Sequence, residues 1–247
     1  MSEQFVRYEL QDRVATICID DGKRNALSPA VLQEIYRALD RAEADRATVI
    51  LTGRESVFSA GFDLKVMRRG GVEALRMLRT GYALTARVMA YPYPVVAACN
   101  GHVMAMGVFL MLSADYVIGS RGDFRVAANE VAIGLTMPRV AAAMLRHRLT
   151  PAAFQRAVTL SEFFDVESAK GAGFFDELVD PAGLQARAAE HAASLQELDL
   201  RAHAASKRRI RAPLIRHIRR SLPLDLLDAM LMGLRGKRPN QSSLSRQ

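Results

Sequence analysis

Cysteine is scarce in this chain of 247 residues, and long apolar runs are missing. No run reaches the roughly 18–20 apolar residues that cross a bilayer, so the sequence predicts no membrane helix. The opening residues, MSEQFVRYEL, lack the basic, apolar and small-residue order of a secretion signal. The two cysteines, Cys18 and Cys99, lie in apolar strand-like runs. We expect both to be buried free thiols in a reducing, cytoplasmic setting.

Metal-ligand clusters are also missing from the sequence. Its five histidines are scattered, and no Cys/His group has the spacing of a zinc site. We therefore expect no metal site and no prosthetic group. Half of the residues are apolar and about a quarter are charged, which is ordinary for a globular protein. No linker or internal repeat divides the chain, and its length suffices for one domain with a large core.

Positive charge is concentrated at one end of the chain. Residues 201–247 hold twelve Lys and Arg against two aspartates, a net charge of +10, which leaves −2 for residues 1–200. Such a basic segment favours an anionic partner: a nucleotide-bearing cofactor, a nucleic acid or an acidic surface. A solvated helix face is the alternative interpretation.

Strand and helix patterns alternate over the first 135 residues. A hairpin is predicted around residues 11–13, and Ser28 with Pro29 marks the start of an amphipathic helix that ends near Ala44. Alternation of this kind predicts an α/β fold with parallel strands joined by crossover helices. The further predicted strands are 47–53, 95–99 and 116–120, and a further helix is predicted at 72–90.

After Pro138 the pattern becomes purely helical. The predicted helices are 138–148, 151–160, 166–171, 181–197, 200–220 and 223–234. The last thirteen residues have the polar, small-residue composition of a flexible end.

Two segments, VFSAGFDL (57–64) and CNGHVMAMGVFL (99–110), share one pattern. Each is a strand-like run, then glycine and small residues, then the beginning of a helix. A helix start leaves backbone N–H groups without partners and carries partial positive charge. Two such starts that converge would form a two-donor pocket for a developing oxyanion. Spacing alone leaves open two tight turns that bind nothing.

Four segments, in this order and spacing, resemble the crotonase (enoyl-CoA hydratase/isomerase) superfamily: VFSAGFDL, NGHVMAMG, SADYVI and NEVAIGL. RNALSP (24–29) and AKGAGFFDELVD (169–180) are also similar to segments of that family, so the resemblance covers about residues 5–185. It implies a spiral of ββα units, a helical C-terminal region that joins subunits into a homotrimer or hexamer, and acyl-CoA ligands. On this basis we expect a crotonase core at 1–195. Residues 196–247 would form a basic helical region, in the same domain or as an oligomerisation appendage.

The resemblance also implies the residues that contact the thioester. The oxyanion donors fall on the main-chain N–H groups of Phe62 and Met106, although the family more often has glycine at the second position. Ala60 matches a main-chain contact to the adenine of coenzyme A. Lys65 and Arg24 match positions where basic side chains approach its phosphates. Lys65 could equally be a solvent-exposed helix residue.

Family hydratases use two glutamates that hold a water between them. The second position falls on Glu130, but the first falls on Phe109, and a phenyl ring can neither activate water nor transfer a proton. One carboxylate is enough to take a proton from one carbon and return it to another. This arrangement resembles the Δ3,Δ2-enoyl-CoA isomerases of the superfamily. An apolar setting would raise the pKa of Glu130, whereas a surface loop would leave it an ordinary glutamate.

Other acidic and basic candidates have simpler interpretations. Asp63 is expected to cap the following helix, His102 to be packed or solvent-facing, and Asp115 to be structural. FRVAANE (124–130) is two residues longer than the hydratase pattern, which would alter the approach of Glu130 to the substrate.

The function predicted from these residues is double-bond isomerisation of an enoyl-CoA, in fatty acid metabolism, with coenzyme A present only as part of the substrate. One alternative is an enoyl-CoA hydratase, which is a lyase, that uses Glu130 alone. The other is a homologue that binds acyl-CoA or RNA without catalysis. The basic segment SKRRIRAPLIRHIRR (206–220) could contact the coenzyme A phosphate or RNA. Its lack of interleaved aromatic residues makes sequence-specific RNA readout a poor fit.

Overall fold

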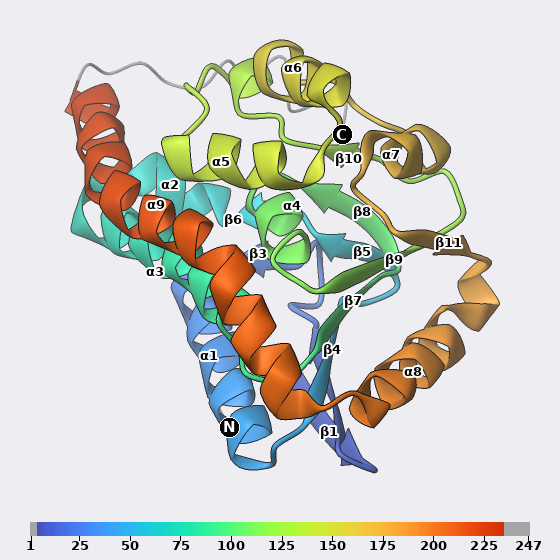
Figure 1. Ribbon diagram of the computed structural model, residues 1–247. Coiled ribbons are helices and arrows are strands. Elements are labelled where there is room, and N and C mark those ends of the chain that lie inside the picture. The colour runs from blue at the N-terminus through green and yellow to red at the C-terminus, as the bar shows by residue number, and fades with distance from the viewer. Residues whose placement is uncertain (1–3, 235–247) are drawn as a thin grey trace.

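A six-stranded sheet lies at the centre of the computed structural model, which describes residues 4–234 (Figure 1). The strand order is β1-β2-β4-β7-β9-β11; β1 and β2 are antiparallel and the other neighbours are parallel. The strands are β1 (Val6–Gln11), β2 (Val14–Ile19), β4 (Thr48–Thr52), β7 (Val95–Cys99), β9 (Tyr116–Ser120) and β11 (Glu177–Val179). Every residue of β4 and β7 is buried, as expected for parallel strands that are covered on both faces.

The predicted hairpin and first helix are confirmed. Asp12 and Arg13 join β1 to β2, and both have positive φ angles, +48° and +61°, as in the two-residue turns whose twist matches the strands. Helix α1 (Pro29–Ala44) begins after Ser28, whose hydroxyl accepts a hydrogen bond from the Val31 N–H. Proline at the first helical position adds no unsatisfied donor, so the sequence fixes this start locally.

A second, smaller group of strands lies beside the central sheet and carries the glycine-containing turns (Figure 1). It consists of β5 (Ser56–Ser59), β8 (Gly101–Met104) and β10 (Val126–Ala127), which are parallel, and of the pair β3 (Ala26–Leu27) and β6 (Gly61–Phe62). The remaining helices are α2 (Leu64–Arg69), α3 (Gly71–Met89), α4 (Met106–Met111), α5 (Arg139–Arg148), α6 (Pro151–Leu160), α7 (Val166–Ala172), α8 (Leu184–Ser194) and α9 (Leu200–Leu234). Three 3-10 turns complete the fold: Val131–Ile133, Pro181–Gly183 and Leu195–Glu197.

Two predictions for the second half of the chain are wrong. Residues 200–234 form one helix, α9, and Pro223 lies inside it instead of starting a second helix. Buried side chains of α9, such as Ile215 and Ile218, pack into the main core and keep the helix continuous where proline removes a hydrogen bond. The stretch after Pro138 is also not purely helical, because β11 pairs with β9 and completes the central sheet.

Helix α9 is fixed to the core by buried charges. The Asp115 carboxylate pairs with Lys207 at 2.5 Å and with Arg211 at 3.0 Å, and both basic side chains are buried. Asp115 also accepts a hydrogen bond from the Val95 N–H, so its predicted structural role is confirmed. Near the other end of α9, Asp225 accepts hydrogen bonds from the first two N–H groups of α5. These bonds hold α9 along α3 and α5 (Figure 1).

The predicted flexible end, residues 235–247, lies outside the described residues, and the boundary between 195 and 196 stays a prediction. None of the helices within residues 4–234 is both long enough and apolar enough to cross a membrane.

Both cysteines are free, and Cys99 is buried as predicted. Cys18 is only half-buried, because its side of the sheet borders an open cavity.

Candidate active site

The turn at residues 59–62 is held in place by hydrogen bonds to Ser59 and Asn25. The Ser59 hydroxyl accepts a hydrogen bond from the Gly61 N–H at 3.1 Å and donates one to the Asn25 carbonyl at 2.8 Å. Gly61 has φ +89°, which only glycine adopts without strain. The chain therefore turns sharply after β5 and enters β6 with Phe62.

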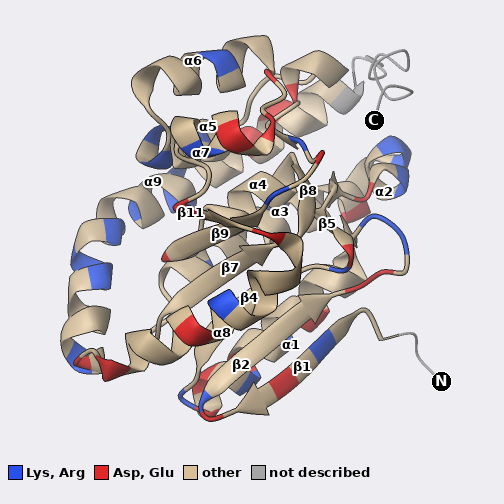
Figure 2. Ribbon diagram, turned by 90° about the vertical axis from the view of Figure 1, so that its right-hand side faces the viewer, with Lys and Arg blue, Asp and Glu red and all other residues tan. Residues whose placement is uncertain are grey.

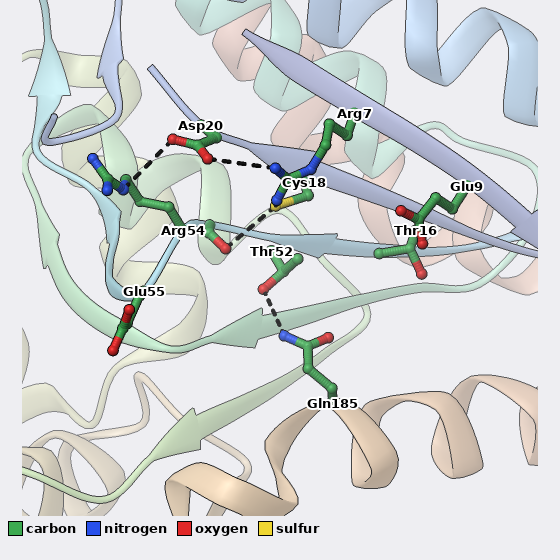
Figure 3. Close-up of a pocket in the computed structure, with 10 residues that line it drawn as sticks. Arg7, Glu9, Thr16, Cys18, Asp20, Thr52, Arg54, Glu55 and Gln185 are labelled. Carbon is green, nitrogen blue, oxygen red and sulfur yellow. Dashed lines mark hydrogen bonds and ion pairs between the residues drawn. The ribbon is translucent and has the colours of Figure 1, made fainter. Parts of the chain in front are cut away.

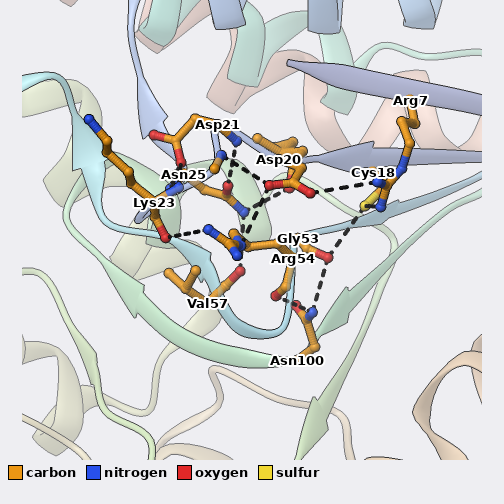
Figure 4. Close-up of polar contacts among 12 residues, drawn as sticks. Arg7, Cys18, Asp20, Asp21, Lys23, Asn25, Gly53, Arg54, Val57 and Asn100 are labelled. Carbon is orange, nitrogen blue, oxygen red and sulfur yellow. Dashed lines mark hydrogen bonds and ion pairs between the residues drawn. The ribbon is translucent and has the colours of Figure 1, made fainter. Parts of the chain in front are cut away.

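Asn25 ties this turn to the central sheet (Figure 4). Its side chain is fully buried, and its amide group donates hydrogen bonds to the carbonyls of Ile19 at 2.8 Å and Val57 at 3.2 Å. The Ala60 N–H donates to the Arg24 carbonyl at 3.0 Å. Sequence reasoning missed this role of Asn25. Its positive φ, +52°, is a conformation that asparagine tolerates better than most residues, and that preference was the available signal.

The second turn, at residues 104–107, leaves a free donor at the start of α4. Met106 is the first residue of that helix, so its N–H has no partner within the helix. The preceding Ala105 has φ +47°, a sparsely populated conformation for a residue with a side chain. Its own N–H is satisfied by the Ala127 carbonyl at 2.8 Å, which fixes the turn against β10.

The two turns touch each other. A Cβ atom at Gly61 would lie 2.9 Å from the Ala105 Cβ and 3.2 Å from the Met106 nitrogen. A Cβ atom at Gly107 would lie 2.7 Å from the Ser59 carbonyl oxygen. The segments that carry the Phe62 and Met106 amides therefore pack together without room for a side chain between them.

Glu130 is a buried, unpaired carboxyl group and not a surface glutamate. It is 6% exposed, and its Oε2 atom has no hydrogen-bond partner among the described residues. Burial raises its pKa from the ordinary 4.5 to about 7. The loop that follows is fixed, because the Leu135 N–H donates to the Glu130 carbonyl and the Ala132 N–H donates to the Ser161 hydroxyl at 3.0 Å.

Aromatic side chains surround this part of the molecule. The Tyr82 ring, from α3, meets the Phe62 ring edge to face at 5.7 Å and packs at a tilt against Phe109 at 6.4 Å. Tyr82 and Phe109 are both buried. The charge of Glu130 adds to burial in raising the pKa of Tyr82, so the two groups are electrostatic neighbours. The Tyr82 ring thus packs beside both Phe62 and Phe109, and sequence reasoning had not singled it out.

The candidate coenzyme A contacts lie near the first turn. Ala60 and Arg24 are bonded through their main chains, and the Arg24 side chain is exposed. Lys65 is also exposed, in the first turn of α2. Asp63 caps that helix, as predicted, by accepting a hydrogen bond from the Lys65 N–H at 2.7 Å. Both basic side chains are thus free to reach an anionic ligand.

His102 is packed, in agreement with the simpler prediction. Its Nδ1 atom accepts a hydrogen bond from the Arg125 N–H at 3.1 Å, and its ring meets Phe124 edge to face at 5.6 Å. Burial lowers the pKa of His102, so the ring is neutral near pH 7.

A cavity of about 440 Å³ lies elsewhere, between the hairpin strands, β4 and α8 (Figure 3). Its lining is polar and consists of Arg7, Glu9, Thr16, Cys18, Asp20, Thr52, Gly53, Arg54, Glu55 and Gln185. Asp20 pairs with Arg7 and Arg54, and Thr52 accepts a hydrogen bond from Gln185. None of the predicted site residues lines this cavity. Within residues 4–234, no group of three or more His, Cys, Asp or Glu side chains could hold a metal ion.

Comparisons with known proteins show the family to which the chain belongs. The sequence model of the enoyl-CoA hydratase/isomerase family matches residues 9–226. A Thermus thermophilus protein that bears the name enoyl-CoA hydratase is 34% identical over 191 residues, which are 74% of this chain and 73% of that protein.

Solved structures of the same family are also similar. An enoyl-CoA hydratase/isomerase family protein from Pseudomonas syringae superposes with a TM-score of 0.89 and 41% identity, over 90% of this chain and 97% of that one. An enoyl-CoA isomerase from Mycobacterium tuberculosis gives a TM-score of 0.86 and 41% identity, over the same shares of the two chains. The predicted crotonase fold is confirmed, and the chain belongs to the enoyl-CoA hydratase/isomerase family of enzymes.

Proposed function

We propose that this enzyme moves the double bond of an enoyl-CoA from the 3,4 to the 2,3 position. The observation that carries the proposal is a single buried, unpaired carboxylate, Glu130, with the phenyl ring of Phe109 where family hydratases keep a second glutamate. A lone carboxylate can transfer a proton but cannot share the activation of water with a second carboxylate. The names of similar solved structures do not decide between the two reactions, because the same Mycobacterium tuberculosis protein is described once as an enoyl-CoA isomerase and once as a probable enoyl-CoA hydratase.

In the proposed mechanism, the Phe62 and Met106 N–H groups donate hydrogen bonds to the thioester oxygen. The ionised Glu130 takes a proton from C2, and the electrons form a dienolate whose charge rests on that oxygen. Glu130 then returns the proton to C4, which leaves the double bond between C2 and C3. No water is added or lost. A pKa of about 7 suits this role, because the group both accepts and releases a proton near neutral pH.

The coenzyme A part of the substrate is proposed to lie along the first turn, with its adenine near the Ala60 main chain. Arg24 and Lys65 would approach its phosphates, which their exposure permits. No prosthetic group is needed for the proton transfer. We further propose that the enzyme is a homotrimer or hexamer, as the family resemblance implies.

The proposal is tested by incubating the purified enzyme separately with a 3-enoyl-CoA and a 2-enoyl-CoA, and following conjugation and hydration. We expect conjugation of the 3-enoyl-CoA, and a loss of at least about a hundredfold in kcat for Glu130→Gln. Glu73→Gln, an exposed glutamate of α3, is the control and should keep full activity. Isomerisation that survives Glu130→Gln would remove Glu130 as the base.

The other outcomes identify the alternatives. Hydration without isomerisation would indicate a lyase, and saturable acyl-CoA binding without turnover would indicate a binding protein. The structure gives less support to the RNA-binding alternative. Two basic residues of segment 206–220, Lys207 and Arg211, are buried against Asp115 and cannot contact RNA. Filter binding across a range of salt concentrations tests that alternative, since phosphate-driven affinity falls steeply with salt.

A further inference from the structure

Gly81 lies inside α3, where its backbone conformation does not require glycine. It belongs to the continuous helix Gly71–Met89, it is buried, and its φ angle is not one of the positive ones. Inside a helix glycine is less favourable than alanine, because it loses more conformational freedom on folding. The reason for glycine at this position is therefore space and not backbone geometry.

The space beside Gly81 is filled by the ring of Phe62. A Cβ atom at Gly81 would lie 2.4 Å from Cε1 and 2.6 Å from Cζ of that ring. Carbon atoms in contact are usually about 3.5 Å apart or more, so the ring or the helix would have to move by about 1 Å to accept a methyl group. The next residue of α3, Tyr82, meets the same ring edge to face at 5.7 Å. The Phe62 side chain is thus packed closely against α3 at Gly81.

Met106 reaches the same position from α4. Its Cε atom would lie 3.7 Å from a Cβ atom at Gly81, which is ordinary contact, and the residue is fully buried. Phe62 and Met106 are the two residues whose main-chain N–H groups are the proposed oxyanion donors. Their side chains therefore meet at one glycine of α3, in addition to the contact between their turns at Gly61 and Ala105.

We propose that Gly81 is a positioning residue for both oxyanion donors: the absence of a side chain there lets the Phe62 and Met106 side chains pack on α3, and this packing fixes the directions of their N–H groups. Strand β6 has only two residues, so backbone pairing alone holds Phe62 weakly. An oxyanion hole is effective because its donors are aimed at the oxygen before the reaction begins. This inference rests on the proposed function, in which these donors hold the thioester oxygen.

Gly81→Ala tests the inference, because it adds one carbon atom at the contact. We expect kcat to fall about a hundredfold, with KM changed less than about threefold, since a displacement of about 1 Å can cost this much in rate. Gly171→Ala in α7 is the matched control. It makes the same change inside a helix, where nothing lies within 4 Å of the added carbon, and should keep the wild-type kcat.

A double-mutant cycle shows whether the added carbon acts through the Phe62 ring. Phe62→Ala removes the ring and keeps the N–H group, and we expect it to lower kcat about tenfold because the donor loses its support. In that background Gly81→Ala should change kcat less than about twofold, because no ring is left to displace. A similar loss from Gly81→Ala in both backgrounds would mean that the added carbon acts elsewhere, and it would overturn the inference.

A second measurement does not depend on turnover. Infrared difference spectroscopy of bound butanoyl-CoA, labelled with carbon-13 at the thioester carbonyl, reports how strongly the two donors polarise that bond. We expect the carbonyl stretch to move to lower frequency on binding to the wild type and to Gly171→Ala, and to move less in Gly81→Ala. If Gly81→Ala does not fold, Phe62→Ala takes its place and should show the same smaller shift.

The infrared result separates this inference from the proposed function. Equal shifts in the wild type and in these variants would overturn the positioning role, even if the wild type isomerises an enoyl-CoA. If the wild type turns over no 3-enoyl-CoA, the proposed isomerase function fails, and the infrared comparison still decides whether Gly81 positions the donors.

Discussion

Glu130 is a carboxyl group in surroundings that favour its uncharged form. It is 6% exposed, has an unpaired oxygen, and has a pKa of about 7 in place of the ordinary 4.5. The folded protein therefore holds a proton between pH 4.5 and 7 that the unfolded chain has already released. Because the folded state binds more protons in this window, its stability must fall as the pH rises through it.

Replacing Glu130 with glutamine should remove that pH dependence. We expect the wild type to lose up to about 3 kcal/mol of unfolding free energy, relative to Glu130→Gln, between pH 4.5 and pH 8. Urea denaturation of both proteins at these two pH values measures the difference. If the unfolding free energies of the two proteins change equally with pH, the pKa of Glu130 is not raised in the folded protein.

Single residues divide into those that sequence could identify and those that it could not. Glu130 was identified from its motif, and an apolar setting for it was anticipated. Asn25 and Tyr82 were not identified, because their roles depend on partners that are distant in sequence: the Val57 carbonyl, and the rings of Phe62 and Phe109. A sequence shows which groups can donate a hydrogen bond or pack as rings, but not which distant groups the fold brings to them.

At the scale of elements, the contact between the two turns is the feature on which the proposed oxyanion site depends. Gly61 has a positive φ and lies where any Cβ atom would meet Ala105 and the Met106 nitrogen. A side chain there would push α4 and its first N–H group away from Phe62. The position thus requires glycine both for its backbone conformation and for the space.

Gly61→Ala should therefore reduce catalysis more than a simple loss of stability would. We expect kcat to fall by about 10²–10³, the effect of losing one oxyanion donor. The control is Gly171→Ala in α7, where nothing lies within 4 Å of the added carbon, and activity should stay at the wild-type level. Steady-state kinetics on folded protein, checked by circular dichroism, make the comparison. Full activity of Gly61→Ala would show that catalysis does not depend on the conformation of this turn.

Elements whose ends carry local signals were predicted closely, whereas two- and three-residue strands and the continuity of α9 were not. The bounds of α1, α5 and α6 follow from caps, prolines and periodicity that are local in sequence. Strands β10 and β11 have two and three residues, too few to show an alternating pattern, and they form because neighbouring strands present open edges. Helix α9 continues through Pro223 because tertiary packing outweighs a local breaker.

At the scale of the whole molecule, α9 presents different faces to the core and to its surroundings. Lys207 and Arg211 are buried against Asp115, whereas other arginines of the helix are exposed. Figure 2 shows that Lys and Arg positions recur along α9. The net charge of the basic segment is therefore larger than the positive charge that a partner can contact. Near its C-terminal end the same helix exposes a group of large apolar side chains: Leu224, Leu227, Met230 and Leu231.

If this apolar group joins subunits, a charge within it should separate them. We expect the wild type to elute as a trimer or hexamer, and Leu227→Glu as a smaller species, in size-exclusion chromatography with light scattering. Leu160→Glu is the control, because Leu160 is 70% exposed on α6, outside this group. A monomeric wild type would rule out the proposed assembly, and an unchanged Leu227→Glu would move the interface elsewhere.

The hydrogen bonds of Asp225 also have a consequence for biosynthesis. A ribosome makes Arg139 and Val140 more than eighty residues before the aspartate that caps their helix, and it makes Asp115 about ninety residues before Lys207. A chain truncated before α9 would lack both interactions. Asp115 would have no counter-ions, and α5, which follows the loop of Glu130, would have no cap. We therefore expect the fold to be completed only after α9 has been synthesised.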